Sequence, residues 1–141
     1  MSKASSPMDQ IIKLERACFG ESAWSATQVQ GALAQSGAVV VVHPTGYVLG
    51  AMVLDEVELH RIGVLPSARA AGLGLRLFQE FTSKARARGA EKLFLEVRED
   101  NVPARRLYAT AGLHPEGVRP RYYADGCAAV LYTGALFEAA P

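Results

Sequence analysis

The sequence predicts an α/β protein in which helices flank a mixed β-sheet, and three observations carry that prediction. Residues 38–64 are rich in β-branched side chains and are interrupted by two short turns, which predicts three antiparallel strands. A long amphipathic segment, residues 72–88, follows them, and another apolar strand comes directly after it. A strand–helix–strand unit within one sheet predicts a right-handed parallel crossover, so the sheet is expected to be mixed.

Two helices are expected before the first strand. Ser6 and Pro7 suit the N-cap and the first position of a helix, and apolar residues then recur at helical spacing up to Phe19. Ser25 and Gln28 have the spacing of a capping box, which predicts a second helix. This second helix is expected to end before Gly37.

The three antiparallel strands are expected at residues 38–42, 47–54 and 57–64. The segment Pro44-Thr45-Gly46 supplies turn residues between the first two strands, and Asp55-Glu56 is a tight connection between the second and the third. Together they predict a meander.

The helix over residues 72–88 has a buried stripe and a clear end. Gly89 suits the left-handed residue just past a helix, and the stripe consists of Leu73, Leu77, Phe81 and Ala85. The strand that follows is expected at residues 93–97.

A further helix and two strands complete the predicted order. Asn101 suits a helix N-cap, Pro103 lies in the first turn, and Gly112 comes just past the end. Residues 115–123 and 128–137 are expected to pair as a hairpin.

Length and composition indicate one ordinary globular domain, expected over residues 1–141 with a flexible segment at 1–6. Half of the residues are hydrophobic and the net charge is +1, so no global basicity points to nucleic acid. Two cysteines form neither a disulfide framework nor a zinc-ligand pattern. The first ten residues lack the apolar core of a signal peptide, and no run has the length of a membrane span. We therefore expect a cytoplasmic protein that binds neither nucleic acid nor membrane, with its oligomeric state left open.

The segment between Arg69 and Gly74 is the most informative one, because it joins a strand to a helix. Glycines at a helix N-terminus let backbone N–H groups approach an anion, and the helix dipole supplies roughly half a positive charge there. A pyrophosphate is one expected ligand, and a glycine turn without a ligand is the alternative. No Gly-Lys-Ser/Thr follows, and the glycine spacing differs from that of a dinucleotide-binding fingerprint.

Longer stretches resemble a known family. ELHRIGVLP from Glu58, followed by RAAGLG from Arg69, resembles the acyl-CoA motif of the GNAT superfamily of N-acetyltransferases. Residues 95–98 (LEVR), 107–108 (LY), 111–113 (AGL) and 119–123 (RPRYY) narrow the resemblance to the RimI branch, which acetylates the N-terminal alanine of a small-subunit ribosomal protein. The resemblance covers residues 8–135.

The resemblance implies a GNAT-type sheet in which two parallel strands diverge and acyl-CoA lies in the gap. Main-chain groups of Ile62 and Val64 would bind the pantetheine arm, and Gly63 would provide a bulge or a close backbone approach. Packing alone could explain that glycine, and helix capping alone could explain Asn101, which matches a cofactor-contacting asparagine. The glycine loop would hold the pyrophosphate through Arg69, Ala70, Ala71, Gly72, Leu73, Gly74 and Leu75. Acetyl-CoA is the implied cosubstrate, and no metal is expected.

Two residues are candidates for catalysis. Glu96 lies in an otherwise apolar strand, where it could take a proton from the acceptor amine, either directly or through a water. Tyr108 matches the family residue that protonates the departing CoA thiolate. A solvated strand face is the alternative for Glu96, and a core aromatic is the alternative for Tyr108.

The remaining reactive side chains are expected to be incidental. His43, His60 and His114 fall in unrelated elements without metal-ligand spacing, and Cys18 extends a helix stripe. Cys127 lies in the final hairpin turn, with nothing to suggest a Cys–His nucleophile. Direct transfer without an acyl-enzyme is therefore expected.

The acceptor is expected to be the α-amine of an alanine-initiated, ribosomal protein. A small amine or another protein is an alternative acceptor, and a catalytically silent acyl-CoA-binding module is the alternative from another class. The residues that could line the acceptor groove, or pack as aromatics around the last hairpin, are Trp24, Arg119, Tyr122 and Tyr123. Three features depart from the family: Ala23 replaces a proline, residues 125–129 read DGCAA where further acidic residues are usual, and no first short strand is evident in residues 2–6.

Overall fold

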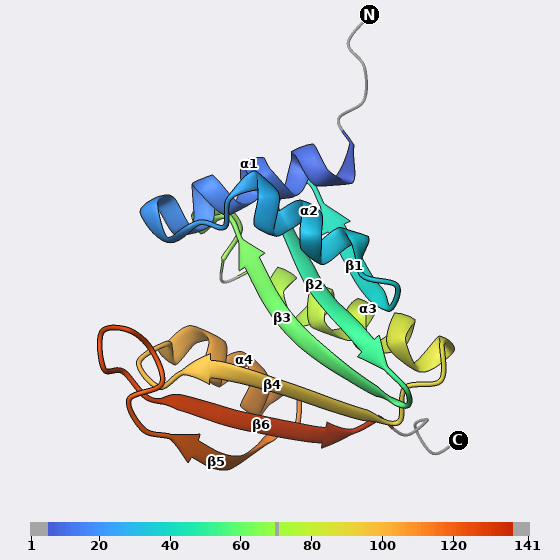
Figure 1. Ribbon diagram of the computed structural model, residues 1–141, viewed down its shortest axis with the longest axis vertical. Coiled ribbons are helices and arrows are strands. Elements are labelled where there is room, and N and C mark those ends of the chain that lie inside the picture. The colour runs from blue at the N-terminus through green and yellow to red at the C-terminus, as the bar shows by residue number, and fades with distance from the viewer. Residues whose placement is uncertain (1–5, 70, 137–141) are drawn as a thin grey trace, which may run out of the picture.

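The computed structural model describes residues 6–69 and 71–136 (Figure 1). It contains one six-stranded sheet in the order β1-β2-β3-β4-β6-β5. The strands are β1 (Ala38–His43), β2 (Gly46–Val53), β3 (Glu56–Val64), β4 (Lys92–Arg98), β5 (His114–Arg119) and β6 (Ala129–Ala135). The helices are α1 (Pro7–Phe19), α2 (Ala26–Ala34), α3 (Leu73–Ala87) and α4 (Val102–Thr110), with short 3₁₀ turns η1 (Gly20–Ser22) and η2 (Pro66–Ala68).

The sheet is mixed, as predicted. Strands β1, β2 and β3 form the antiparallel meander, and β3 and β4 are parallel neighbours joined through α3. The parallel pairing is short, because it runs only from Glu56 opposite Lys92 to Leu59 opposite Leu95. The chain of β3 continues to Val64 without β4 beside it, so a gap opens in the sheet.

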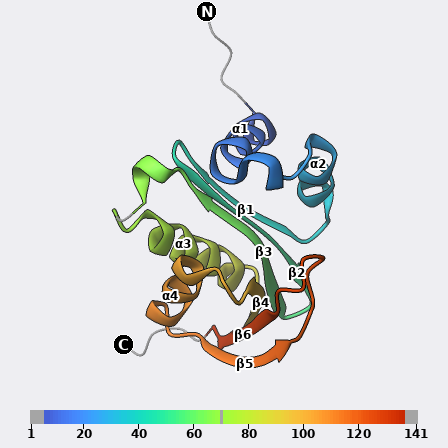
Figure 2. The ribbon, with the colours of Figure 1, turned by 90° about the vertical axis from the view of Figure 1, so that its left-hand side faces the viewer.

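Helices cover the two faces unequally (Figure 2). On one face α1 and α2 pack against β1, β2 and β3, and on the other lie α3 and α4. Two cores result: α3, α4 and the buried side of the sheet enclose the larger, and α1, α2 and β2 enclose the smaller. Among the described residues, the α1–α2 side of β4, β6 and β5 carries no helix (Figure 1). Within the same residues, no helix combines the length and apolar character needed to cross a membrane.

The capping hydrogen bonds and the left-handed glycines predicted at the helix ends are present in the structure. The Ser6 hydroxyl accepts a hydrogen bond from the Asp9 N–H, and Ser25 with Gln28 forms the complete capping box. Gly89 follows α3 with a positive φ of 100°, and Gly112 follows α4 with 92°. These contacts span a few residues along the chain, which explains why the sequence predicts them.

The predicted end of the fold is partly wrong. Residues 115–123 were expected to form one strand, but β5 ends at Arg119 and residues 120–128 form a loop. Arg121 has a φ of 53°, which an extended strand excludes, and Pro120 offers no N–H to a ladder. Tyr122 and Tyr123 therefore lie on a loop. Residue 137, the expected last strand residue, lies outside the described residues, as do residues 2–5, where the first short strand was sought.

Candidate active site

A cleft of about 470 Å³ opens where β3 and β4 diverge. Phe19, from the end of α1, lies on one side of the sheet, and Leu107 of α4 lies on the other, so the cleft crosses the gap. The predicted cofactor residues that line it are Ile62, Gly63, Val64, Arg69, Gly72, Gly74, Leu75 and Asn101. Residues from three separate parts of the chain therefore meet at one place.

The glycine loop gives α3 an open N-terminus. Gly72 is its N-cap with a φ of 80°, a conformation that side chains rarely adopt, and no side chain caps the helix. The first-turn N–H groups are therefore available to an anion. The Arg69 Nε donates to the Val64 carbonyl oxygen at 2.9 Å, which ties the loop back to β3. Leu73 packs on the core and Ala71 is exposed outside the cleft lining, while Ala70 lies outside the described residues.

Two glycines at the cleft, Gly74 and Gly63, differ in how much space a side chain would have. A Cβ on Gly74 would lie 3.6 Å from Leu107 and 3.9 Å from Val64, in ordinary contact, so the free protein has room for it. A Cβ on Gly63 would lie 2.7 Å from the Tyr47 ring, so packing requires this glycine. The bulge expected at Gly63 occurs instead at His60, where the register between β2 and β3 shifts.

The α4 face of the cleft was missed by the sequence analysis. Asn101 accepts from the Ala104 N–H at 3.2 Å, so it does cap the helix, and it also lines the cleft. The cleft is also lined by five α4 residues that the sequence analysis did not predict: Pro103, Ala104, Arg106, Leu107 and Thr110. Their spacing of three and four marks one face of a helix, which was the signal available in the sequence.

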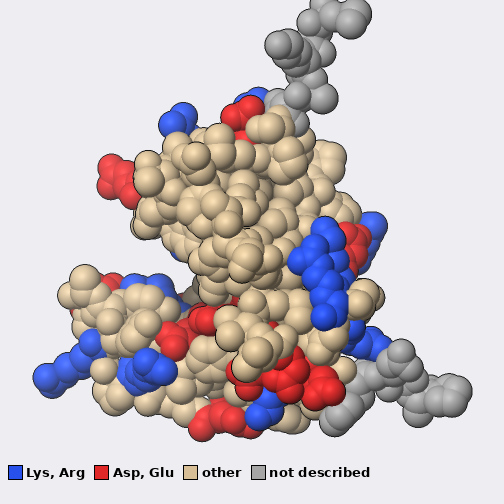
Figure 3. Space-filling model, turned by 45° about the vertical axis from the view of Figure 1, so that its right-hand side comes forward, with Lys and Arg blue, Asp and Glu red and all other residues tan. Residues whose placement is uncertain are grey.

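Glu96 lies on the helix-free face of the sheet, and three predicted acceptor residues gather around it. Its side chain is 17% exposed, and its carboxylate lies 3.5 Å from the Arg119 guanidinium. The carboxylate raises the pKa of Tyr122, first as a hydrogen-bond acceptor and then through its charge. Burial, followed by the charge of Glu96, raises the pKa of Tyr123. Glu96 is therefore held among polar partners. Figure 3 shows acidic side chains gathered in a hollow of the surface seen in that view.

Tyr108 lies on the opposite side of β4 from Glu96. Its ring is 3% exposed and packs between Phe78 and Tyr132, at centroid distances of 5.9 and 5.7 Å. Burial raises the pKa of its phenol, which keeps it protonated. The Glu96 side chain and α4 lie on opposite faces of the sheet. Glu96 and Tyr108 could therefore both reach one reacting group only at the gap between β3 and β4.

Trp24 lies apart from these residues, in a buried polar network that the sequence analysis missed. The Glu15 carboxylate is fully buried and accepts hydrogen bonds from the Trp24 backbone N–H at 2.7 Å, the Arg61 Nε at 2.8 Å and the Tyr47 hydroxyl. Arg61 also lies 3.8 Å from the Phe19 ring centroid and 5.3 Å from that of Trp24. Glu15 shares a helix face with Ile11 at a spacing of four, which was the signal available for its burial.

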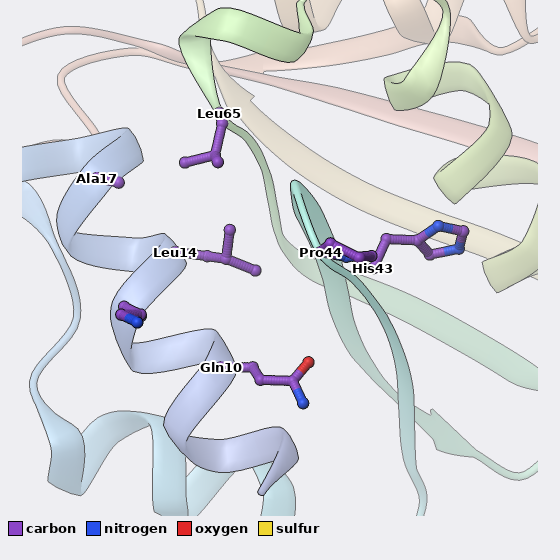
Figure 4. Close-up of a pocket in the computed structure, with 7 residues that line it drawn as sticks. Gln10, Leu14, Ala17, His43, Pro44 and Leu65 are labelled. Carbon is purple, nitrogen blue, oxygen red and sulfur yellow. The ribbon is translucent and has the colours of Figure 1, made fainter. Parts of the chain in front are cut away.

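A second cavity, of about 540 Å³, lies between α1 and the turn that joins β1 to β2 (Figure 4). Leu14 and Ala17 approach it from α1, and Pro44 from the turn. His43 points away toward α3, where its Nε2 lies 2.8 Å from Glu80. No predicted site residue lines this cavity, so it is separate from the cleft. Within the described residues, no group of histidine, cysteine or acidic side chains could hold a metal ion.

The fold and the cleft define a class of protein. An uncapped helix N-terminus, a gap between parallel strands and the unpaired length of β3 together suit an extended ligand with a pyrophosphate at one end. This is the shape and charge of an acyl-CoA.

Comparison with known proteins identifies the family. The Acetyltransferase (GNAT) family profile matches residues 9–113. A Bacillus subtilis protein provisionally named as a ribosomal protein bS18-alanine N-acetyltransferase is 29% identical over 124 residues, which are 84% of this chain and 82% of that protein. The N-alpha-acetyltransferase RimI of Mycobacterium tuberculosis is 39% identical over 90 residues, 64% of this chain and 55% of its own length. The crystal structure of the Escherichia coli ribosomal-protein-S18-alanine N-acetyltransferase has a TM-score of 0.83 and 24% identity, covering 99% of this chain and 94% of that one.

The chain belongs to the GNAT acetyltransferase family. It is an acyl-CoA-dependent N-acetyltransferase that is similar to RimI-type enzymes, and acetyl-CoA is its cosubstrate. The expected GNAT fold is thereby confirmed.

Proposed function

We propose that the protein transfers acetyl from acetyl-CoA to the N-terminal α-amine of a protein that begins with alanine, and that this acceptor is a ribosomal protein. The observation that carries the proposal is the helix-free face of β4, β6 and β5, which leaves Glu96 accessible beside the gap. A face of this kind can take an extended peptide, whereas small-molecule sites are usually concave pockets that enclose most of the ligand. The name of the Bacillus subtilis relative, a bS18-alanine N-acetyltransferase, supports the same acceptor, and the name of the Mycobacterium tuberculosis relative supports an α-amine. The proposed acceptor places the reaction in the cytoplasm.

The chain offers a complete cradle for the cosubstrate. The first-turn N–H groups of α3, from Leu73 to Leu75, would bind the pyrophosphate, and the absence of a side chain at Gly74 gives it room. Unpaired main-chain groups of β3 around Ile62 would order the pantetheine arm, as an added strand is ordered. When bound, acetyl-CoA supplies an activated thioester. The residues of this chain bind and orient the two substrates and transfer the protons.

Glu96 would act as the general base. A free α-amine has a pKa of about 7.7–8.0, compared with about 10.4 for lysine, so a far larger fraction is neutral near pH 7. A carboxylate base therefore has to deprotonate a smaller fraction of an α-amine than of a lysine amine. The contacts of Glu96 with Arg119 and Tyr122 hold the carboxylate in place until the acceptor amine arrives.

Tyr108 would act as the general acid. Its raised pKa keeps the phenol protonated at neutral pH, so the hydroxyl can donate a hydrogen bond, and then its proton, to the leaving thiolate as negative charge develops there. Packing between Phe78 and Tyr132 limits the motion of the ring. The acid and the base would thus act from opposite faces of the sheet on one acetyl group in the gap.

The deciding experiment compares two peptides in a thiol-release assay with product mass spectrometry. One is a ribosomal peptide that begins with alanine, and the other is its N-terminally blocked copy with a free lysine. Faster acetylation of the free alanine peptide is the expected result. Preference for the blocked lysine peptide, or for a small amine over both, would refute the acceptor assignment while leaving the acetyltransferase class intact. Absence of thiol release with every acceptor would indicate a binding module.

A further inference from the structure

The loop of residues 120–128 holds an ion-pair cluster that the catalytic scheme does not use. The cluster centres on Arg98, the last residue of β4, whose guanidinium contacts two carboxylates from different parts of the chain. Asp100 belongs to the segment just after β4, at 3.1 Å from the Arg98 Nε. Asp125 belongs to the loop, and its Oδ2 accepts from the Arg98 Nη2 at 2.5 Å.

Asp125 also organises the loop internally. Its Oδ1 accepts from the Cys127 N–H at 3.0 Å, so one carboxylate joins the loop backbone to β4. The Tyr123 N–H donates to the Cys127 carbonyl at 3.1 Å, which closes the loop on itself. Arg121, at a φ of 53°, turns the chain within this loop. The conformation that presents the tyrosines therefore depends on contacts at the far end of the loop.

A continuous chain of contacts joins this cluster to Glu96. The Arg98 guanidinium lies 4.9 Å from the Tyr123 ring centroid, within cation–π range. Tyr123 and Tyr122 meet edge to face, with centroids 5.1 Å apart and planes at 87°. The Tyr122 hydroxyl in turn hydrogen-bonds the Glu96 carboxylate, and this contact raises the pKa of the phenol. The chain of contacts runs along the helix-free face.

We propose that Asp125 and Arg98 are positioning residues, which clamp the 120–128 loop to β4 so that Tyr122 and Tyr123 frame the acceptor site beside Glu96. The consequence for catalysis rests on the proposed function, whereas the clamp itself does not.

Two variants separate the clamp from a general charge effect. Asp125→Ala removes the loop's contact with Arg98 but leaves Asp100 paired to it. Asp100→Ala removes the same charge from the same arginine and leaves the loop clamped by Asp125. Asp100 interacts with the loop through a weak contact with the Cys127 thiol and through the like charge of Asp125, and neither interaction holds the loop against β4 as the Arg98–Asp125 pair does. Both aspartates are exposed, at 58% and 64%, so both variants are expected to fold.

The first measurement is independent of any substrate. Trypsin can cut after Arg121 inside the loop, but not after Arg119, because proline follows it. Cutting requires local opening, so its rate reports the clamp. For loss of an exposed networked pair we expect about fivefold faster cutting in Asp125→Ala, and less than about twofold in Asp100→Ala, measured by mass spectrometry of the two fragments. Equal rates in the two variants, or no change in either, would overturn the clamp.

The second measurement tests the consequence for the acceptor. In Asp125→Ala, kcat/KM for the alanine peptide should fall by about fivefold while the KM for acetyl-CoA stays unchanged, and Asp100→Ala should resemble the wild type. Faster cutting without a change in the peptide kinetics would overturn the positioning role. If the wild-type protein acetylated no peptide, the proposed function would fail, and the cutting rates would still decide the clamp.

Discussion

Replacing Gly74 with glutamate tests the cofactor cleft directly, because the structure separates its effect on binding from its effect on folding. The Cβ of a side chain at this position would make only ordinary contacts, 3.6 Å from Leu107, so the fold can accept it. Glutamate has a better helix propensity than glycine by roughly 0.5–1 kcal/mol, so thermal stability should not fall. In the cleft, however, the side chain would occupy the pyrophosphate position and repel its charge. We expect CoA affinity to weaken at least tenfold, or about 1.4 kcal/mol.

Gly31→Glu is the matched control. Gly31 also lies within a helix, α2, and nothing lies within 4 Å of the Cβ position. This variant should show a similar gain in helix propensity and bind CoA like the wild type. The assays are calorimetric titration with CoA and thermal unfolding of each variant. Unchanged CoA affinity in a folded Gly74→Glu protein would refute the pyrophosphate assignment, and a loss shared by both variants would show an indirect effect.

Three further predictions concern the chemistry and the buried network. Glu96→Gln should lose about 10²–10⁴-fold in rate at low pH and recover partly as pH rises, because more acceptor amine is then neutral; an equal loss at every pH would indicate a positional role. Tyr108→Phe should lower kcat with little change in the KM for acetyl-CoA, and turnover near the wild-type value would remove the phenol from the mechanism. Burial alone would raise the pKa of Glu15, but hydrogen bonds from Arg61, Tyr47 and Trp24 outweigh it and hold the pKa below its usual 4.5. Glu15 therefore stabilises the fold above pH 4.5, and this contribution is lost as pH falls through the lower folded-state pKa. Glu15→Gln should cost about 3 kcal/mol at pH 7 in urea unfolding, with the difference from the wild type shrinking in acid; a constant difference would refute the ionised state.

Local features of the fold follow from the sequence because their partners are close along the chain. Ser25 and Gln28 cap α2 across three residues, and Gly72 and Gly89 mark the two ends of α3. Hydrophobic spacing predicts the helices and the meander for the same reason. The glycine loop, its place at a helix start and its anion-binding chemistry can likewise be read from contiguous residues.

The arrangement of the site depends on contacts between residues far apart in the chain. Pairing of β3 with β4 ends at Leu59 and Leu95, and the gap beyond that point exists only because the two strands diverge in three dimensions. The alternation of side chains along β4 directs Glu96 to one face of the sheet, and the packing of α4 against the other face places Tyr108 there. The loop of residues 120–128 resembles a strand in its composition, but the left-handed Arg121 and the Arg98–Asp125 contact determine its path.

The sequence by itself therefore determined the order of the elements, the glycine loop and the family. Only the tertiary structure decided which residues face Glu96, and that Trp24 lies with Glu15 and Arg61 rather than among them. The physical reason is that caps and periodicity act over three or four residues, whereas the cleft and the open face arise from packing between segments separated by dozens of residues.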